Sequence, residues 1–343
     1  MTDVTPQSDL LSAGRKHGTA SVTLPRSPWI RALVHGLSRI AVGRLTLILP
    51  TGERLVFGAA GADDPQATLH LHNARAARRM IRGGNIGLGE GYMTGDWSSP
   101  DLRALIELAI LNEERLSGAL LGRWWSGLAR ALRHFRTRNS RSGSRRNIAY
   151  HYDLGNAFYR RWLDETMTYS AALFTEDGQS LAEAQRAKYR RIADLAEVKQ
   201  GARVLEIGCG WGGFARLAAK EYGAHVEGIT LSAEQLAFAR EAAEATGLTE
   251  QTAFHYRDYR DQKGRYDAIV SIEMFEAVGE EHWSSYFKAL KRNLAAGGRA
   301  IVQVITLDEK RFLESRKSAD FIQRYIFPGG KLPSKTAFIE AAA

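Results

Sequence analysis

Residues 203–215 read Arg-Val-Leu-Glu-Ile-Gly-Cys-Gly-Trp-Gly-Gly-Phe-Ala, and this stretch predicts how the second half of the chain folds. It begins with the short apolar, β-branched run that is typical of a buried parallel strand. Residues 214–222 then have the pattern of a helix. Between them lie four glycines: Gly208, Gly210, Gly212 and Gly213. Because glycines let the backbone approach a ligand and a helix N-terminus offers free N–H groups, this order predicts a cofactor site.

Two cofactors fit the glycine spacing. Gly208, Gly210 and Gly213 satisfy Gly-x-Gly-x-x-Gly, and Glu227 lies near the position of the ribose-binding acid in a dinucleotide fold. Glu206, however, stands two residues before the first glycine. The resulting Glu-x-Gly-x-Gly-x-Gly resembles the first motif of methyltransferases that use S-adenosyl-L-methionine (SAM). The pattern favours SAM, with a nicotinamide dinucleotide or a turn that binds nothing as the weaker alternatives.

Length and composition bound the other expectations. The chain has 343 residues and is 44% apolar, which suits two domains or one large domain with an extension. It contains no apolar run of 18 or more residues. Residues 1–27 are polar and lack a hydrophobic signal core, so we expect a disordered N-terminus and a cytoplasmic location. Cys209 is the sole cysteine, which excludes an internal disulfide.

The positive charge is concentrated in one segment. No acidic residue lies between Glu114 and Asp153, whereas nine arginines do, and the net charge of the whole chain is +9. Leucine, tryptophan and phenylalanine side chains form an apolar stripe over Leu116–Phe135. We interpret residues 116–146 as a basic amphipathic helix and linker that suit an anionic phospholipid surface. A helix packed on the neighbouring domain remains an equal alternative, and nucleic acid is not the expected partner.

The segment before this helix predicts a small α+β domain over residues 28–115, which we associate with lipid. A helix starts at Pro28, a hairpin surrounds Pro50-Thr51-Gly52, and a third short strand covers Ala67–Leu71. Helical patterns follow over Asn73–Arg82 and Asp101–Asn112.

The segment after it, residues 147–343, predicts a doubly wound α/β domain, because strands and helices alternate. After the glycine loop we expect strands over His225–Ile229, Thr252–Tyr256, Tyr266–Ile272 and Arg299–Ile305, and helices over Ser232–Thr246 and Trp283–Leu294. Gly247 and Gly297-Gly298 are expected to end these two helices. Ligands of such sheets bind at the carboxyl ends of the strands.

Several of those strand ends carry the motifs of one family. The motifs are His151–Asn156, Met167–Ser170, Leu205–Gly213, Gly228–Ser232, Asp258–Arg260, Met274–Glu276 and Tyr325–Gly330. With them the chain resembles cyclopropane-fatty-acyl-phospholipid synthases, which are SAM-dependent C-methyltransferases with a Rossmann-like sheet. The likeness spans roughly residues 41–343. Parts of it also occur in small-molecule N-methyltransferases, so that function stays an alternative.

The resemblance implies a set of cofactor-binding residues and no metal. Tyr152, Tyr169 and Ser170 are expected over the cofactor. Gly208, Gly210 and Gly212, with Glu206, are expected around its methionine part. Thr230, Leu231 and Gln235 would surround the ribose, and Asp258 would accept a hydrogen bond from the adenine amine. The plain alternatives are a loop cap for Asp258 and a solvated first-turn residue for Gln235.

The resemblance also implies the chemistry. The methyl group adds to an alkene, the resulting carbocation is stabilised by aromatic faces, and a base removes a proton. That base is expected to be a bicarbonate held partly by Glu276, and Glu276, Gln303 and Tyr169 are the catalytic candidates. Ala171, Gln303 and Ala277 stand where the family has cysteine, histidine and histidine. Bicarbonate binding, and the choice between a cyclopropane and a methylated product, are therefore left open.

The leading hypothesis is an enzyme that methylates unsaturated phospholipid acyl chains at the inner membrane surface, with a homodimer left open. The rivals are an N-methyltransferase of a small amine and a lipid- or SAM-binding protein without turnover. The sheet of such enzymes has seven strands, and the sequence predicts five by Ile305. We therefore expect a sheet truncated before its last strands, with the strand at Arg299–Ile305 along an open edge.

Overall fold

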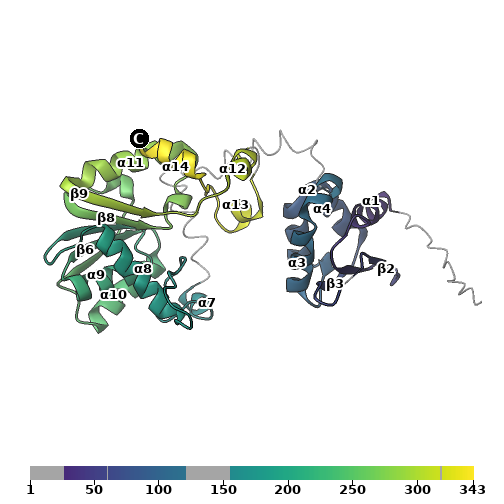
Figure 1. Ribbon diagram of the computed structural model, residues 1–343, viewed down its shortest axis with the longest axis horizontal. Coiled ribbons are helices and arrows are strands. Elements are labelled where there is room, and N and C mark those ends of the chain that lie inside the picture. The colour runs from purple at the N-terminus through teal and green to yellow at the C-terminus, as the bar shows by residue number, and fades with distance from the viewer. Residues whose placement is uncertain (1–26, 60, 121–154, 317–318) are drawn as a thin grey trace, which may run out of the picture. The chain divides into compact units, whose positions relative to one another are not determined.

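A computed structural model describes residues 27–59, 61–120, 155–316 and 319–343 (Figure 1). The chain divides into two compact units, with the division after Gly122. Most of the predicted basic helix, the linker and Tyr152 lie outside the described residues. Within the described residues, no helix is long and apolar enough to cross a bilayer.

The first unit contains a four-stranded sheet in the order β2-β1-β3-β4. Its strands are β1 (Arg44–Ile48), β2 (Arg54–Phe57), β3 (Gln66–Leu71) and β4 (Trp97–Ser98). Strands β1 and β2 form the predicted antiparallel hairpin, in which Leu45 pairs with Phe57. Strand β3 lies parallel to β1 on its other side.

Four helices complete this unit: α1 (Pro28–Leu37), α2 (Ala74–Met93), α3 (Leu102–Leu111) and α4 (Glu113–Leu120). Apolar residues of α1, α2 and α3 and of the sheet form one buried core. Helix α2 runs eleven residues past the predicted end at Arg82, with a kink at Gly84, where φ is 55°. Helix α4 starts at Glu113, three residues before the predicted amphipathic helix.

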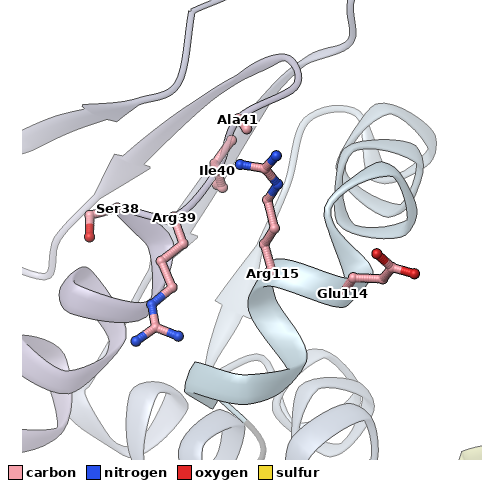
Figure 2. Close-up of a pocket in the computed structure, with 6 residues that line it drawn as sticks. All are labelled: Ser38, Arg39, Ile40, Ala41, Glu114 and Arg115. Carbon is pink, nitrogen blue, oxygen red and sulfur yellow. The ribbon is translucent and has the colours of Figure 1, made fainter.

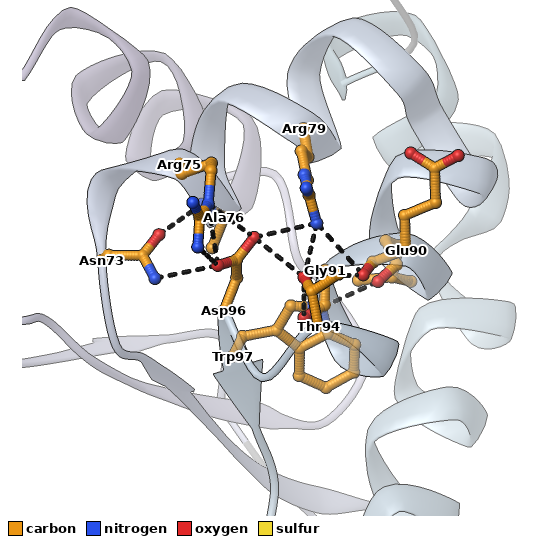
Figure 3. A network of polar contacts seen from close by, with 10 residues as sticks. Asn73, Arg75, Ala76, Arg79, Glu90, Gly91, Thr94, Asp96 and Trp97 are labelled. Atoms are coloured by element: carbon orange, nitrogen blue, oxygen red, sulfur yellow. Dashed lines mark hydrogen bonds and ion pairs between the residues drawn. The ribbon is translucent and has the colours of Figure 1, made fainter.

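A buried aspartate ties α2 to β4 (Figure 3). The Asp96 carboxylate accepts hydrogen bonds from Arg75 at 2.6 and 2.9 Å and from Asn73 at 3.0 Å, and Arg79 lies 3.0 Å away. Hydrogen bonding from Arg75 lowers the pKa of Asp96 to about 2, although burial opposes this shift. The network keeps a charged group inside the unit without leaving it unpaired.

The second unit is a three-layer α/β structure around a parallel sheet in the order β7-β6-β5-β8-β9. The strands are β5 (Arg203–Ile207), β6 (His225–Thr230), β7 (Thr252–Tyr256), β8 (Tyr266–Ile272) and β9 (Leu294–Gln303). In Figure 1, α8 (Leu181–Leu195), α9 (Gly213–Tyr222) and α10 (Ala233–Ala245) cover one face. Helices α11 (Trp283–Asn293) and α14 (Lys335–Ala342) cover the other face.

The predicted doubly wound class is confirmed, and each of the five predicted strands has a counterpart. The last of them, β9, spans Leu294–Gln303 instead of the predicted Arg299–Ile305 and lies at an edge of the described sheet. One helix end was predicted wrongly. Helix α11 ends at Asn293, and Gly297-Gly298 lie inside β9. An irregularity between Tyr266 and Ala268 lets β9 pair with β8 from Leu294 onward. A Cβ atom at Gly298 would lie 2.7 Å from the Asp267 carbonyl oxygen, so glycine allows the two strands to approach.

The remaining elements lie around the carboxyl end of the sheet. They are α7 (Asn156–Tyr159), α12 (Glu309–Ser315), α13 (Phe321–Tyr325) and three short 3-10 helices, η1 (Tyr259–Asp261), η2 (Phe275–Ala277) and η3 (Glu280–His282). The last segment returns to η2, because the Lys331 N–H donates to the Glu276 carbonyl at 2.7 Å. Helix α14 begins after Ser334, whose side chain accepts a hydrogen bond from the Ala337 N–H.

Candidate active site

The glycine loop between β5 and α9 has the shape of a ligand cradle. Gly208, Gly210 and Gly212 all have positive φ angles, of 79°, 52° and 77°. A Cβ atom at Gly208 would lie 2.5 Å from the Met274 side chain, so protein packing requires that glycine. A Cβ atom at Gly210 would meet no atom within 4 Å. Gly210 therefore borders open space, as expected where backbone approaches a cofactor.

Glu206 supplies a buried acid at the same loop. Its side chain is 3% exposed, and Oε2 has no hydrogen-bond partner. Burial raises the pKa of Glu206 to about 8, although Lys188 and Arg216 counteract that shift. A buried carboxylate oxygen without a donor fits a cationic ligand group such as the ammonium of SAM.

The expected ribose residues follow β6. Thr230 and Gln235 are both buried, and the Thr230 hydroxyl donates to Gln235 Oε1 at 2.9 Å. Ser232 caps α10 through the Gln235 N–H. Gln235 is therefore not a solvated first-turn residue, and Leu231 lies half-buried between these groups.

Asp258 follows β7 and is 2% exposed. Its carboxylate accepts hydrogen bonds from the Arg260 N–H at 2.9 Å and from the Arg260 guanidinium at 2.6 and 2.8 Å. The loop-cap arrangement is therefore present. To bind adenine, the Asp258 carboxylate would have to accept a hydrogen bond from the adenine amine in addition to those from Arg260.

Glu227 does not lie at the cofactor end of the sheet. It occupies the middle of β6, where it accepts hydrogen bonds from Tyr266 at 2.6 Å and from Gln262 at 3.0 Å. Arg257 donates a third hydrogen bond at 2.9 Å. Because Glu227 is bound to these partners inside the strand, it does not act as a ribose-binding acid. The main argument for a dinucleotide site is thereby lost.

Aromatic side chains that the sequence did not single out cover the glycine loop. Tyr159 lies 5.1 Å from Trp211 and 5.6 Å from Tyr169, and Trp162 lies 5.1 Å from Tyr169, between ring centroids. The Trp211 indole also donates to Asn156 at 2.6 Å. Trp211 is one of the two residues of the loop over 208–213 that are not glycine, so its aromatic character was the available signal.

A cavity of about 310 Å³ opens beside this cluster. Its lining includes Trp162, Tyr169, Ser170, Ala171 and Glu273. Gln185 donates to the Ser170 carbonyl at 2.7 Å, and the Lys188 ammonium donates to the Ser170 hydroxyl. Burial lowers the pKa of Lys188 to about 8, opposed by nearby acids. Tyr169 and Ser170 thus line the same cavity, and Tyr152 lies outside the described residues.

A larger depression of about 540 Å³ lies in the first unit, between α1 and α4 (Figure 2). It is lined by Ser38, Arg39, Ile40, Ala41, Glu114 and Arg115. None of these residues belongs to the predicted site.

Two of the three catalytic candidates, Glu276 and Gln303, lie at the ends of β8 and β9, whereas Tyr169 lines the cavity. Glu276 Oε1 accepts a hydrogen bond from the Ile305 N–H at 2.5 Å, and its buried Oε2 has no partner. Burial raises the pKa of Glu276 to about 7, and the charge of Glu273 adds to that shift. Gln303 does not point to Glu276. Its amide donates to Glu273 Oε1 at 2.8 Å.

These residues do not fit bicarbonate. The Ala171 N–H donates to Glu273 Oε1 at 3.0 Å, so one carboxylate oxygen takes donors from both Ala171 and Gln303. These are the positions at which the resemblance led us to expect the anion. A second anion there would meet the negative charge of Glu273.

The described residues contain no group of three or more His, Cys, Asp or Glu side chains placed to hold a metal ion. The glycine cradle and the unpartnered Glu206 oxygen fit SAM.

Comparison with known proteins identifies the family. The family model for mycolic acid cyclopropane synthetase matches residues 139–343. Tuberculostearic acid methyltransferase UfaA1 of Mycobacterium tuberculosis is 42% identical over 353 residues, which cover 99% of this chain and 81% of the relative. Cyclopropane-fatty-acyl-phospholipid synthase of Escherichia coli is 34% identical over 327 residues, which cover 91% of this chain and 75% of the relative.

A solved structure agrees. Mycolic acid cyclopropane synthase CmaA1 in complex with SAH and CTAB has a TM-score of 0.53 and 31% identity. The match covers 57% of this chain and 72% of that chain. The chain therefore belongs to the mycolic acid cyclopropane synthetase family and is a SAM-dependent methyltransferase of this lipid-modifying family.

Proposed function

We propose that the chain transfers a methyl group from SAM to the double bond of unsaturated phospholipid acyl chains. SAM supplies an electrophilic methyl group when bound. The product is a methylated or cyclopropane acyl chain. The names of the two relatives, a tuberculostearic acid methyltransferase and a cyclopropane-fatty-acyl-phospholipid synthase, support fatty acyl substrates.

The observation that carries the proposal is the cavity that two aromatic residues, Trp162 and Tyr169, line together with the acidic residue Glu273. Methylation of an alkene leaves a positive charge on the neighbouring carbon. Tyr169 and Trp162 border the cavity with their rings, and ring faces stabilise such a charge. Glu276 would add a carboxylate whose Oε2 has no partner, and low-dielectric surroundings strengthen that attraction.

The remaining candidate residues would hold the cofactor. Glu206 and the loop glycines Gly208, Gly210 and Gly212 would bind its methionine part. Thr230, Leu231 and Gln235 would surround the ribose, and Asp258 would bind the adenine. Tyr152, Tyr169 and Ser170 would cover the cofactor. Gln303 would not bind the cofactor but would hold the Glu273 carboxylate near the substrate.

We also propose that residues 116–146 bring the enzyme to anionic membranes. The nine arginines of the acid-free segment support this assignment, because each arginine near an anionic surface contributes about 1 kcal/mol and salt screens it. Binding to sedimented vesicles should rise with anionic lipid content and fall with salt. Equal binding to neutral vesicles would reject the membrane role and favour the alternative, a helix packed on the neighbouring domain.

The test of the function is methyl transfer from labelled SAM to vesicles of unsaturated phospholipid. Vesicles of saturated phospholipid are the matched control, and a set of small amines tests the N-methyltransferase alternative. We expect label in the acyl chains of unsaturated vesicles only. Label in the amines, or SAM binding without transfer, would reject the proposal in favour of the corresponding rival.

A further inference from the structure

We propose that Glu273 is the general base of the reaction, a resident carboxylate in the place of a dissociable anion. This inference deepens the proposed function and rests on it. It concerns which group removes the proton after the methyl group has been added.

The placement of Glu273 is the first argument. Oε1 is fixed by two donors from distant segments, the Ala171 N–H at 3.0 Å and the Gln303 amide at 2.8 Å. Among the described residues, none donates to Oε2. The side chain also lines the cavity that Tyr169 and Trp162 border. One oxygen therefore anchors the carboxylate, and the other is available to a substrate in the cavity.

The backbone of Glu273 is the second argument. Its φ angle is +48°, a conformation that glycine adopts readily and glutamate rarely. Only Met167, Glu197 and Glu273 share a positive φ among the non-glycine residues of the described segments. Residues held in this way concentrate at functional sites, because the surrounding structure must compensate for the strain. Here the compensation includes the two hydrogen bonds to Oε1.

The neighbouring groups are the third argument. Glu276 has its own donor, Ile305, and therefore does not compete for Ala171 or Gln303. The Lys188 ammonium is engaged with the Ser170 hydroxyl. At the positions where the resemblance implies a bound anion, the Ala171 N–H and the Gln303 amide both donate to the Glu273 carboxylate instead. The Glu273 carboxylate thus occupies the position of the expected anion, and its negative charge would repel a bicarbonate there.

The proton transfer balances without another reactant. After the methyl group bonds to one alkene carbon, the adjacent carbon is electron-deficient. Oε2 of Glu273 takes a proton from the added methyl group, and the C–H electron pair closes the ring. When the proton comes from a neighbouring chain carbon instead, the pair forms a double bond and a methylated alkene results. In both cases Glu273 becomes a neutral carboxylic acid, which later releases its proton to water.

The test compares turnover in buffer stripped of carbon dioxide with turnover in millimolar bicarbonate. The wild-type chain should be indifferent to bicarbonate. Glu273→Gln should lose roughly 100-fold or more in turnover and keep its SAM affinity. Glu273→Gly suits the positive φ and empties the position, so it should lose activity similarly and regain about tenfold or more with bicarbonate or formate. Glu250→Gln, an exposed carboxylate in the turn before β7, is the matched control and should behave like wild type.

A binding measurement separates this inference from the proposed function. Calorimetry with bicarbonate, on protein saturated with S-adenosylhomocysteine, should show no binding to wild type and binding to Glu273→Gly. Bicarbonate binding to wild type, bicarbonate-dependent wild-type turnover, or full activity in Glu273→Gln would overturn the role of Glu273. Absence of methyl transfer by wild type would reject the function, and the calorimetry would still test whether Glu273 occupies the anion position.

Discussion

The candidate site at the carboxyl end of the sheet has two sides, and they are built in different ways. The glycine-loop side takes its main groups from one continuous stretch, Glu206–Gly213, and Glu206 is buried there. The β8–β9 side joins Ala171, Glu273 and Gln303. The hydrogen bond from Ala171 to Glu273 connects residues that are 102 positions apart in the sequence. The glycine-loop side therefore depends on the local conformation of one loop. The β8–β9 side depends on hydrogen bonds between segments that are distant in the chain.

The largest expected effect tests the β8–β9 side. Glu276→Gln should lower turnover roughly 100-fold or more, because a neutral amide cannot stabilise a developing positive charge as a carboxylate does. SAM affinity should stay unchanged, since Glu276 lies outside the glycine loop. Single-turnover kinetics and calorimetry measure the two quantities. Full activity in this variant would remove Glu276 from the reaction.

The pH dependence sharpens the same assignment. Since burial raises the pKa of Glu276 to about 7, its carboxylate form predominates only above that pH. Turnover should therefore fall about tenfold for each pH unit below 7, and Glu276→Gln should remove that limb from the profile. The stability effect has the opposite sign. A raised carboxyl pKa stabilises the folded state at low pH, and this contribution is lost as the pH rises through about 7.

The cofactor side is tested by a pair of glycine substitutions. Gly210→Val should lower SAM affinity about tenfold or more, equivalent to roughly 1.4 kcal/mol, because its side chain would enter the open cradle. Gly208→Ala should instead lower the free energy of unfolding by roughly 1–3 kcal/mol, since its Cβ would press on Met274 at a positive φ. Unchanged SAM binding in folded Gly210→Val would show that the loop does not hold the cofactor.

The sequence predicted the conformation of the glycine loop well for a physical reason. The β-branched run and the loop glycines report local conformation, and the positive φ angles of Gly208, Gly210 and Gly212 match that expectation. The strand over Tyr266–Ile272 and the helix that Gly247 ends were likewise predicted from local patterns. Each of these features depends on residues close together in the chain.

The reaction side could not be predicted in the same way. Glu273 directly follows β8, and its hydrogen bonds come from donors that are 102 and 30 residues away in the chain. Gln303 was named as a catalytic candidate at the position of a family histidine, and the sequence did not show that it donates to Glu273. Gly297-Gly298 were mistaken for a helix end, whereas they lie inside β9 and Gly298 allows β8 to approach. Pairing between distant segments leaves no local signal.

The smallest expected effect distinguishes the SAM site from a dinucleotide site. Glu227 is held in the middle of β6 by Tyr266, Gln262 and Arg257. Glu227→Gln weakens hydrogen bonds to a charged group and should lower the free energy of unfolding by roughly 1–2 kcal/mol. SAM affinity should not change, because no cofactor contact is lost. Denaturant unfolding and calorimetry check the two values. A marked loss of SAM affinity, with stability intact, would place Glu227 at the ribose and contradict the separation of the cofactor edge from the strand interior.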